Sequence, residues 1–322
     1  MSQLTFASAT GFETFRKTTR REVFLAEMNQ VVPWRRLLRL IRPRYPKAGN
    51  GRRPTSLEMM LRIYFMQQWF KLSDPAMEDA LYDIESMRRF AGIELGRDTV
   101  PDETTILKFR HLLEKHNLTA KIFQITCGYL EENGLMLREG TIVDATLIAA
   151  PSSTKNQEKK RDPEMTQTKK GNQWYFGMKA HTGTDPKNRV VHTVVATTAS
   201  IHDSQVMDDL LHGGEEEIYG DKAYADEAKK EEFEERGVKW CVSKKANRGR
   251  KLSKKDQKHN RKMSTTRARV EHPFHVIKCL FGYRKVRYRG IYKNAAQLFT
   301  LFSLANLYMV RKKLLDQLPH YA

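Results

Sequence analysis

The sequence predicts an all-helical region followed by an α/β sheet domain, because the spacing of apolar residues changes along the chain. Between residues 55 and 135, apolar residues recur at helical spacing. From residue 141 onward, strand-like runs separated by turn signals alternate with helix start signals. Strands followed by such mixed elements imply a sheet packed against helices. The 322 residues, 40% of them hydrophobic, suffice for one large core or two modest ones.

The N-terminal part is predicted to contain a basic arm and a helical domain. Residues 1–54 hold 12 Lys or Arg against three acidic residues and end in the turn-rich run 46–54, so we expect an arm there. The helical domain is expected over residues 55–135. Its helices are expected to begin at a capping box, Thr55-Ser-Leu-Glu58, and at the N-cap residues Ser73 and Asp102.

The sheet domain is expected over residues 136–312, with a tail over 313–322. Two basic segments, 151–173 and 244–269, are expected as loops between its elements. The apolar stretch 295–310 has a polar residue at every third position and is shorter than the roughly 20 residues of a bilayer span, so it is predicted to be a buried helix. Strands are expected at 141–149, 173–183, 189–199, 217–221 and 238–243, and short helices near Asp203 or Ser204 and at Asp226.

The chain is strongly basic, with a net charge of +19 and a pI near 9.8. This balance predicts a polyanionic partner, and nucleic acid is the first candidate. A generically basic protein, or one that adheres to anionic lipid, is the alternative. Cys127, Cys241 and Cys279 are too scattered for a disulfide framework, and the first residues lack the blocks of a secretory signal. We therefore expect a cytoplasmic, nucleoid-associated protein that binds DNA.

Three carboxylates, Asp144, Asp221 and Glu271, lie far apart in the sequence, each in a segment that should hold it still. Asp144 interrupts the apolar run 141–149, where an unpaired charge is costly. Asp221 ends a strand that leads into a helix, the place where α/β sheets build their sites. Converging oxygen ligands in a cationic protein indicate a magnesium-type metal acting on a phosphodiester. The alternatives are a hydrogen-bonded structural Asp and an ordinary turn Asp.

The segment around Glu271 has helical spacing, which places Arg267, Glu271, His275 and Lys278 on one side. Pro273 should kink or restart this helix, so the facing of Lys278 relative to Glu271 stays open. A surface helix with salt bridges is the alternative interpretation. The spacing therefore predicts a reactive face beside a core-facing one.

These residues resemble the DDE transposases of bacterial insertion sequences, in particular the insertion-sequence-five family. The resemblance is carried by the spacing Arg267-x3-Glu271-x6-Lys278, by Asp144 in Val-Asp-Ala-Thr and by Asp221 in Gly-Asp-Lys-Ala-Tyr. Ser264 departs from the pattern, which often has Tyr three residues before the Arg. Longer matching runs are Pro46-Lys-Ala-Gly-Asn-Gly-Arg-Arg-Pro54, Met77-Glu-Asp-Ala-Leu-Tyr82, Ala150-Pro-Ser-Ser-Thr-Lys-Asn156, Gln167-Thr-Lys-Lys-Gly-Asn-Gln-Trp174, Phe176-Gly-Met-Lys-Ala-His181 and Val270-Glu-His-Pro-Phe274.

The resemblance implies an RNase H-like mixed sheet, with Asp144 on the first strand, Asp221 after the fourth and Glu271 on a later helix. These three would be the catalytic residues and would bind two Mg²⁺ ions, with Mn²⁺ as a substitute. Such an enzyme binds the terminal inverted repeats of the element, frees a 3′-hydroxyl by hydrolysis, and transfers that hydroxyl to target DNA. Two ends must be held together, which implies a homodimer or higher oligomer on DNA.

Several side chains are expected to contact DNA. The signature implies this for Lys278 and Arg267, with an internal salt bridge as the alternative for Arg267. Lys179 and His181 share one face of their strand and are expected at the cleft, unless they only satisfy the strand edge. A helix-turn-helix within residues 73–116, with plain helical packing as the alternative, would present Thr104, Thr105, Lys108 and Arg110. The rival functions are a non-catalytic DNA-binding repressor or architectural protein and a stand-alone metal-dependent nuclease.

Overall fold

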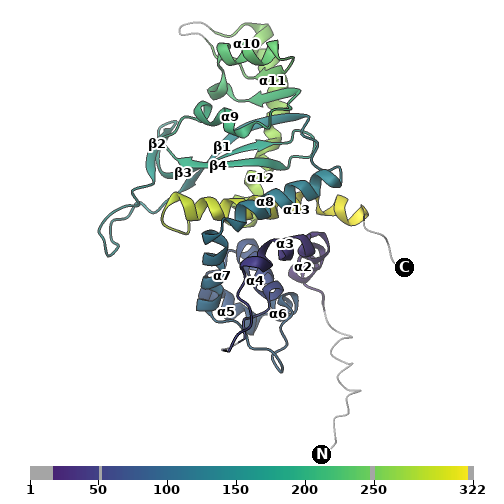
Figure 1. Ribbon diagram of the computed structural model, residues 1–322. Coiled ribbons are helices and arrows are strands. Elements are labelled where there is room, and N and C mark those ends of the chain that lie inside the picture. Colours follow the sequence, from purple (N-terminus) through teal and green to yellow (C-terminus); the bar gives the residue numbers. More distant parts are fainter. Residues whose placement is uncertain (1–16, 51–52, 247–250, 318–322) are drawn as a thin grey trace, which may run out of the picture.

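A computed structural model describes residues 17–50, 53–246 and 251–317. Figure 1 shows a sheet with its own helices at one end and a group of short helices at the other. Helices α8 (Leu118–Glu132) and α13 (Ile291–Gln317) lie between these two regions. The polypeptide is therefore a mixed α/β sheet with helices, preceded by a helical region.

The helical region begins earlier in the chain than expected. The segment expected as a basic arm contains α2 (Arg20–Val31) and α3 (Trp34–Ile41), followed by the short turn η2 (Arg42–Arg44). Leu25 and Leu37 are buried in the main core, so these helices are part of the packed domain. These two helices were not predicted because the many arginines on their exposed sides made the segment resemble a basic arm. Residues 1–16 and 51–52, which belong to the expected arm and its terminal loop, lie outside the described residues.

Two of the three expected helix starts are confirmed. Ser73 Oγ accepts a hydrogen bond from Ala76 N at 3.2 Å, and Asp102 Oδ1 accepts one from Thr105 N at 2.7 Å. The capping box is wrong, because the N-cap is Ser56, whose side chain makes no cap hydrogen bond, and Glu58 pairs with Arg62 instead. The remaining helices of this region are α4 (Leu57–Phe70), α5 (Asp74–Asp83), α6 (Glu85–Ala91) and α7 (Glu103–Lys115).

The sheet contains all five expected strands and one that was not expected. Strand β1 pairs antiparallel with β3 and parallel with β5, β5 pairs parallel with β6, and β3 also pairs antiparallel with β2 and β4. The extra strand is β2, within the expected loop 151–173; its sequence Thr-Gln-Thr-Lys-Lys has no apolar alternation to reveal it. The strands are β1 (Gly140–Ala149), β2 (Thr166–Lys170), β3 (Gln173–Thr184), β4 (Val191–Thr198), β5 (Glu217–Gly220) and β6 (Lys239–Val242).

Helices cover both faces of the sheet. Val143 of β1 packs into a small core with Phe233 of α10, whereas Ile142 on the opposite face joins the main core. The second expected basic loop, 244–269, is wrong over most of its length, because it contains helix α11; residues 247–250 lie outside the described part. The helices and turns of this region are η3 (Asp203–Val206), α9 (Met207–Leu210), η4 (Lys222–Tyr224), α10 (Glu227–Glu235), α11 (Lys254–Arg267), η5 (Ala268–Val270), α12 (Glu271–His275) and the π-helical turn η6 (Val276–Leu280).

The long helix α13 joins the two regions, and its buried polar side chains explain how. Gln297 donates to Gln68 of α4, Thr300 bonds to Tyr64 of the same helix, Ser303 bonds to Thr126 of α8, and Asn306 bonds to the backbone of Val191 in β4. The prediction of a buried helix is thus confirmed. The expected tail is helical as far as Gln317, and residues 318–322 lie outside the described part.

Candidate active site

Asp144 and Asp221 lie side by side at the centre of the sheet. Strands β1 and β5 are parallel, with Ile142 opposite Tyr219. Two residues further along each strand stand Asp144 and Asp221. Asp144 Oδ1 accepts a hydrogen bond from Ala145 N at 2.8 Å, and the Asp221 side chain caps η4. Each carboxylate thus has one oxygen held by the backbone and one that points elsewhere.

Arg267, the last residue of α11, lies between these two aspartates. Its Nη1 atom is 3.9 Å from Asp144 Oδ2 and 3.9 Å from Asp221 Oδ2. The two oxygens are therefore no farther apart than twice that distance. Arg267 Nε is buried and has no hydrogen-bond partner among the described residues. Both ion pairs of the guanidinium are therefore longer than a hydrogen bond.

Glu271 begins α12, one turn after Arg267, and its side chain is exposed. Burial raises the pKa of Asp144 to about 6, the Ala145 amide and Arg267 oppose this, and the charges of Asp221 and Glu271 raise it further. Glu271 is therefore within electrostatic reach of Asp144. In the described ranges, no three His, Cys, Asp or Glu side chains stand in ligand geometry for a metal ion. The cationic group that the structure places between the aspartates is Arg267.

Lys278 is near the same carboxylates but is bound to a different residue than expected. Its Nζ donates to Thr146 Oγ1 at 2.5 Å, and Thr146 shares a sheet face with Asp144, two residues before it. Burial lowers the pKa of Lys278, the nearby charge of Lys170 adds to this, and the charge of Glu271 opposes it. Thr146 was missed in the sequence, although its spacing from Asp144 in a strand was the signal that could have found it.

The expected reactive helix face is only partly correct. His275 lines a separate hollow of about 440 Å³ with His272 and Arg189. The reason is local geometry: η5, α12 and the π-helical η6 follow one another, so the residues no longer keep a uniform spacing of 3.6 per turn. Arg267 contacts Asp144 and Asp221, and Lys278 contacts Thr146 of β1, whereas His275 is not part of this group.

The expectation that Lys179 and His181 approach the cleft is wrong in this structure. Residues 145 and 147 of β1 lie opposite His181 and Lys179, so both side chains are on the sheet face away from Asp144. Lys179 Nζ is 2.9 Å from Asp203 Oδ1, and His181 is fully buried. Burial also lowers the pKa of His181 to about 4, so the ring is neutral near neutral pH. Both side chains therefore pack on the face of the sheet opposite to Asp144.

The expected recognition helix is α7, and its four candidate residues have different surroundings. Arg110 is wrong as a DNA contact, because it is buried and paired with Asp74 and Glu114. Thr105 is partly buried in the first turn of the helix. Thr104 and Lys108 are exposed, four residues apart on one face, and remain candidates.

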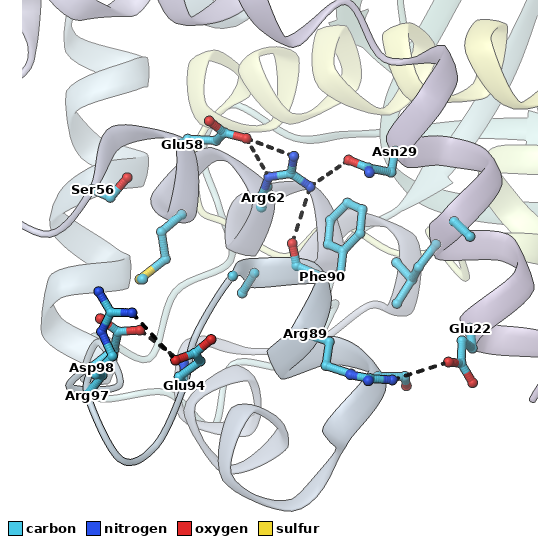
Figure 2. A pocket seen from close by; sticks show the side chains of 16 residues that line it. Glu22, Asn29, Ser56, Glu58, Arg62, Arg89, Phe90, Glu94, Arg97 and Asp98 are labelled. Carbon is cyan, nitrogen blue, oxygen red and sulfur yellow. Dashed lines mark hydrogen bonds and ion pairs between the residues drawn. The ribbon is translucent and has the colours of Figure 1, made fainter. Parts of the chain in front are cut away.

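A hollow of about 760 Å³ lies in the helical region, away from the carboxylates. Figure 2 shows Arg62 at its edge, bound to Glu58, to Asn29 and to the carbonyl of Phe90. The guanidinium also lies 4.3 Å from the ring centroid of Trp34. Arg62 therefore ties α2, α4 and α6 together.

Two family models match the chain. Residues 136–307 match the family model described as a transposase DDE domain, and residues 13–112 match a second, described as a transposase domain (DUF772). The chain belongs to the DDE transposase family. No solved structure matches it. The protein is therefore an enzyme that cleaves DNA and transfers strands, its partner is DNA, and enzymes of this class generally use divalent metal ions.

The match to the second model begins at residue 13 and crosses residue 54, where the arm was expected to end. It therefore treats α2 and α3 together with the later helices, as the packing does. Among the described residues, no helix is long and apolar enough to cross a bilayer.

Proposed function

We propose that Asp144, Asp221 and Glu271 are the catalytic and metal-binding residues of this transposase. The observation that carries the proposal is the parallel register that sets Asp144 beside Asp221, with a single arginine nitrogen 3.9 Å from an oxygen of each. Glu271 follows that arginine by one helical turn. We further propose that residues 136–312 form an RNase H-like domain of the insertion-sequence-five type, on the basis of strand order and the motifs quoted above.

The types of these residues suit a divalent cation, although their side chains do not stand in ligand geometry in this structure. Asp144 is mostly buried, with 18% of its side chain exposed, and this burial raises its pKa, as do the negative charges of Asp221 and Glu271 to a smaller extent. A buried carboxylate in this state gains most from a nearby cation. Carboxylate oxygens are the ligands that Mg²⁺ prefers, and Mn²⁺ accepts the same set. When bound, such ions would take up negative charge on the attacking and leaving oxygens of the phosphodiester.

The protein's own groups have separate tasks in this proposal. Arg267 balances the two aspartates in the free protein and is placed to pair with a phosphate when DNA enters. Lys278, held by Thr146, presents its ammonium group along the same face. In the first reaction a water oxygen bonds to phosphorus, the bond from phosphorus to the 3′-oxygen breaks, and that oxygen leaves as a hydroxyl. In the second, the freed hydroxyl attacks a target phosphate in the same way.

Two basic surfaces would hold the DNA duplex. Helix α11 exposes a row of cations around a hollow of about 510 Å³, lined by Lys255, Lys258, His259, Arg261, Lys262 and Thr265. A second hollow of about 460 Å³ lies where β1 ends and contains Lys155, Lys160, Arg161, Arg287 and Arg289. We propose that these cations make phosphate contacts that do not depend on sequence, and that Thr104 and Lys108 of α7 add contacts in the helical region. We also propose that two copies act together, since two ends of the element must be joined.

The test is a joining reaction with purified protein, a labelled end of the encoding element, supercoiled target DNA and Mg²⁺. We expect Asp144→Asn, Asp221→Asn and Glu271→Gln each to reduce joined product by more than about 100-fold, because loss of groups that only support metal ligands already costs 10- to 100-fold. Asp209→Asn, an exposed carboxylate on α9, is the matched control and should join as wild type does. Full activity in any of the three variants would remove that residue from the site. Hydrolysis without joining would favour a nuclease, and binding without any cleavage would favour a repressor.

A further inference from the structure

The hairpin formed by β2 and β3 carries an exposed tryptophan that the proposed reaction does not use. Trp174 is 64% exposed, more than any other large hydrophobic side chain in the described part of the chain. It stands second in β3, after a tight turn in which Gly171 has a φ of 62°. An exposed indole offers a flat apolar face and an N–H donor to a binding partner.

Trp174 lies on the same sheet face as the proposed catalytic carboxylates. In the pairing of β1 with β3, Asp144 is opposite Thr182 and Thr146 is opposite Ala180. Side chains at alternate positions of a strand share a face, so 182, 180, 178, 176 and 174 follow one another on the face of Asp144. Eight residues of extended strand separate Trp174 from Thr182, a span of at most about 27 Å.

The hairpin tip is also cationic. Lys169 is paired with Trp174 across the two strands, and its Nζ is 5.9 Å from the centroid of the indole ring. Neither Lys169 nor Lys170 forms an ion pair within the described residues, so both charges are available. Lys170 is close enough to Lys278 to affect its protonation, which brings the tip toward the site. Lys170 is opposite Gln173, so by strand alternation it lies on the other face of the hairpin, and only Lys169 shares the face of the indole. An aromatic ring beside an unpaired lysine is an arrangement that binds a nucleic-acid base together with its phosphate.

We propose that Trp174 stacks on an unpaired base of the bound DNA, while Lys169 contacts a phosphate that flanks it. This inference rests on the proposed function, since it places the strand that carries the scissile phosphate along the Asp144 face. B-form DNA rises 3.4 Å per nucleotide on each strand, so the stacked base lies within about eight nucleotides of that phosphate. The hairpin is then the element that recognises unpaired DNA near the cut.

The experiment measures binding of full-length protein to two short duplexes in EDTA, one blunt and one with a single-stranded thymidine overhang. We expect tighter binding of the overhang DNA and quenching of tryptophan fluorescence on binding. Stacking on an aromatic side chain contributes enough that Trp174→Ala should reduce the preference for the overhang by about 5- to 100-fold and remove most of the quenching. Trp174→Phe should retain part of the preference. Tyr82→Ala, another exposed aromatic at 51%, is the matched control and should change nothing.

Three results would overturn the proposal. The first is equal affinity of wild type for both duplexes. The second is a loss of affinity in Trp174→Ala that is the same for both, because it would make the hairpin a general duplex contact. The third is a change in the oligomeric state of Trp174→Ala with unchanged DNA preference, because it would assign the indole to a contact between copies. The binding assay needs neither metal nor cleavage, so Asp144→Asn should bind both duplexes as wild type does. If wild type prefers the overhang DNA but the joining reaction does not depend on Asp144, only the assignment of Asp144 as a catalytic residue is wrong.

Discussion

The helical region and the sheet region each bury carboxylates beside an arginine, and the two arrangements differ. Arg110 is 8% exposed, lies 3.0 Å from Asp74 and 3.4 Å from Glu114, and stacks on the ring of Tyr288. Arg267 is 33% exposed and comes no closer than 3.9 Å to either of its aspartates. The first cluster is closed by direct contacts, whereas the second leaves carboxylate oxygens without close partners.

The difference indicates that the Arg110 cluster stabilises the fold, whereas the Arg267 cluster has a function in binding. A buried ion pair with short contacts is costly to break, because one partner is left as an isolated charge. The group around Asp144 has two aspartates and a nearby glutamate against Arg267 and Lys278, so negative charges outnumber positive ones before any ligand binds. This imbalance is a cost to folding and is expected where a cation and a phosphate are to be bound.

The largest expected effect is on the closed cluster. We expect Arg110→Met to lower the free energy of unfolding by about 3–5 kcal/mol, since it leaves Asp74 and Glu114 buried without their cation. Urea denaturation followed by circular dichroism measures this. The neighbouring exposed residue provides the control: Lys108→Met should stay within about 0.5 kcal/mol of wild type. Equal stability of the two variants would show that the Arg110 cluster is not structural.

The open cluster should respond in the opposite direction. Without metal, we expect Asp144→Asn to be about 1–3 kcal/mol more stable than wild type at about pH 8, because it removes a buried charge whose pKa is raised. The pKa of the Asp144 carboxyl is higher in the folded protein, about 6, than its unfolded value of 3.8. The folded protein therefore has its full stability from this group below pH 3.8 and loses it as the pH rises through about 6. The two proteins should therefore converge at about pH 4. Urea midpoints at both pH values in EDTA check this; a variant less stable than wild type at pH 8 would contradict the comparison.

The smallest effects are expected on the exposed cations. Lys258→Ala in α11 and Lys108→Ala in α7 should each reduce the slope of log affinity against log salt by about one, without a change in unfolding. Fluorescence anisotropy on a labelled duplex across a salt series measures the slope. Lys230→Ala in α10 is the control, because Lys230 already pairs with Glu227. A slope unchanged by Lys258→Ala would remove the α11 face from the proposed DNA surface.

Most of the sheet could be predicted from local pattern, and the elements that were missed have a common cause. The five expected strands carry apolar residues that are buried in the structure, for example Ile142 and Ile218. Strand β2 and helix α11 are rich in lysine and are held mainly by pairing or capping, so their composition was typical of loops. The same bias hid α2 and α3 among the arginines of the N-terminal segment.

For the candidate site, the types of the residues could be predicted from the sequence, but the directions in which their side chains point could not. Asp144, Asp221 and Glu271 could be selected because each is an acid in a segment that should be ordered. Lys179 and His181 were placed in the cleft because strand alternation shows that two residues share a face, but not which face it is. Arg110 was assigned to DNA because helical spacing does not show that Tyr288 and Asp74 come to cover it.

The sequence by itself determined the identity of the acids, the excess of positive charge and the order of most elements, because these depend on residue type and short-range spacing. Only the tertiary structure decided that Asp144 and Asp221 are neighbours, that Arg267 stands between them, and that Trp174 shares their face of the sheet. The physical reason is that strand register and side-chain facing are set by pairing between segments far apart in the chain, which no local pattern encodes.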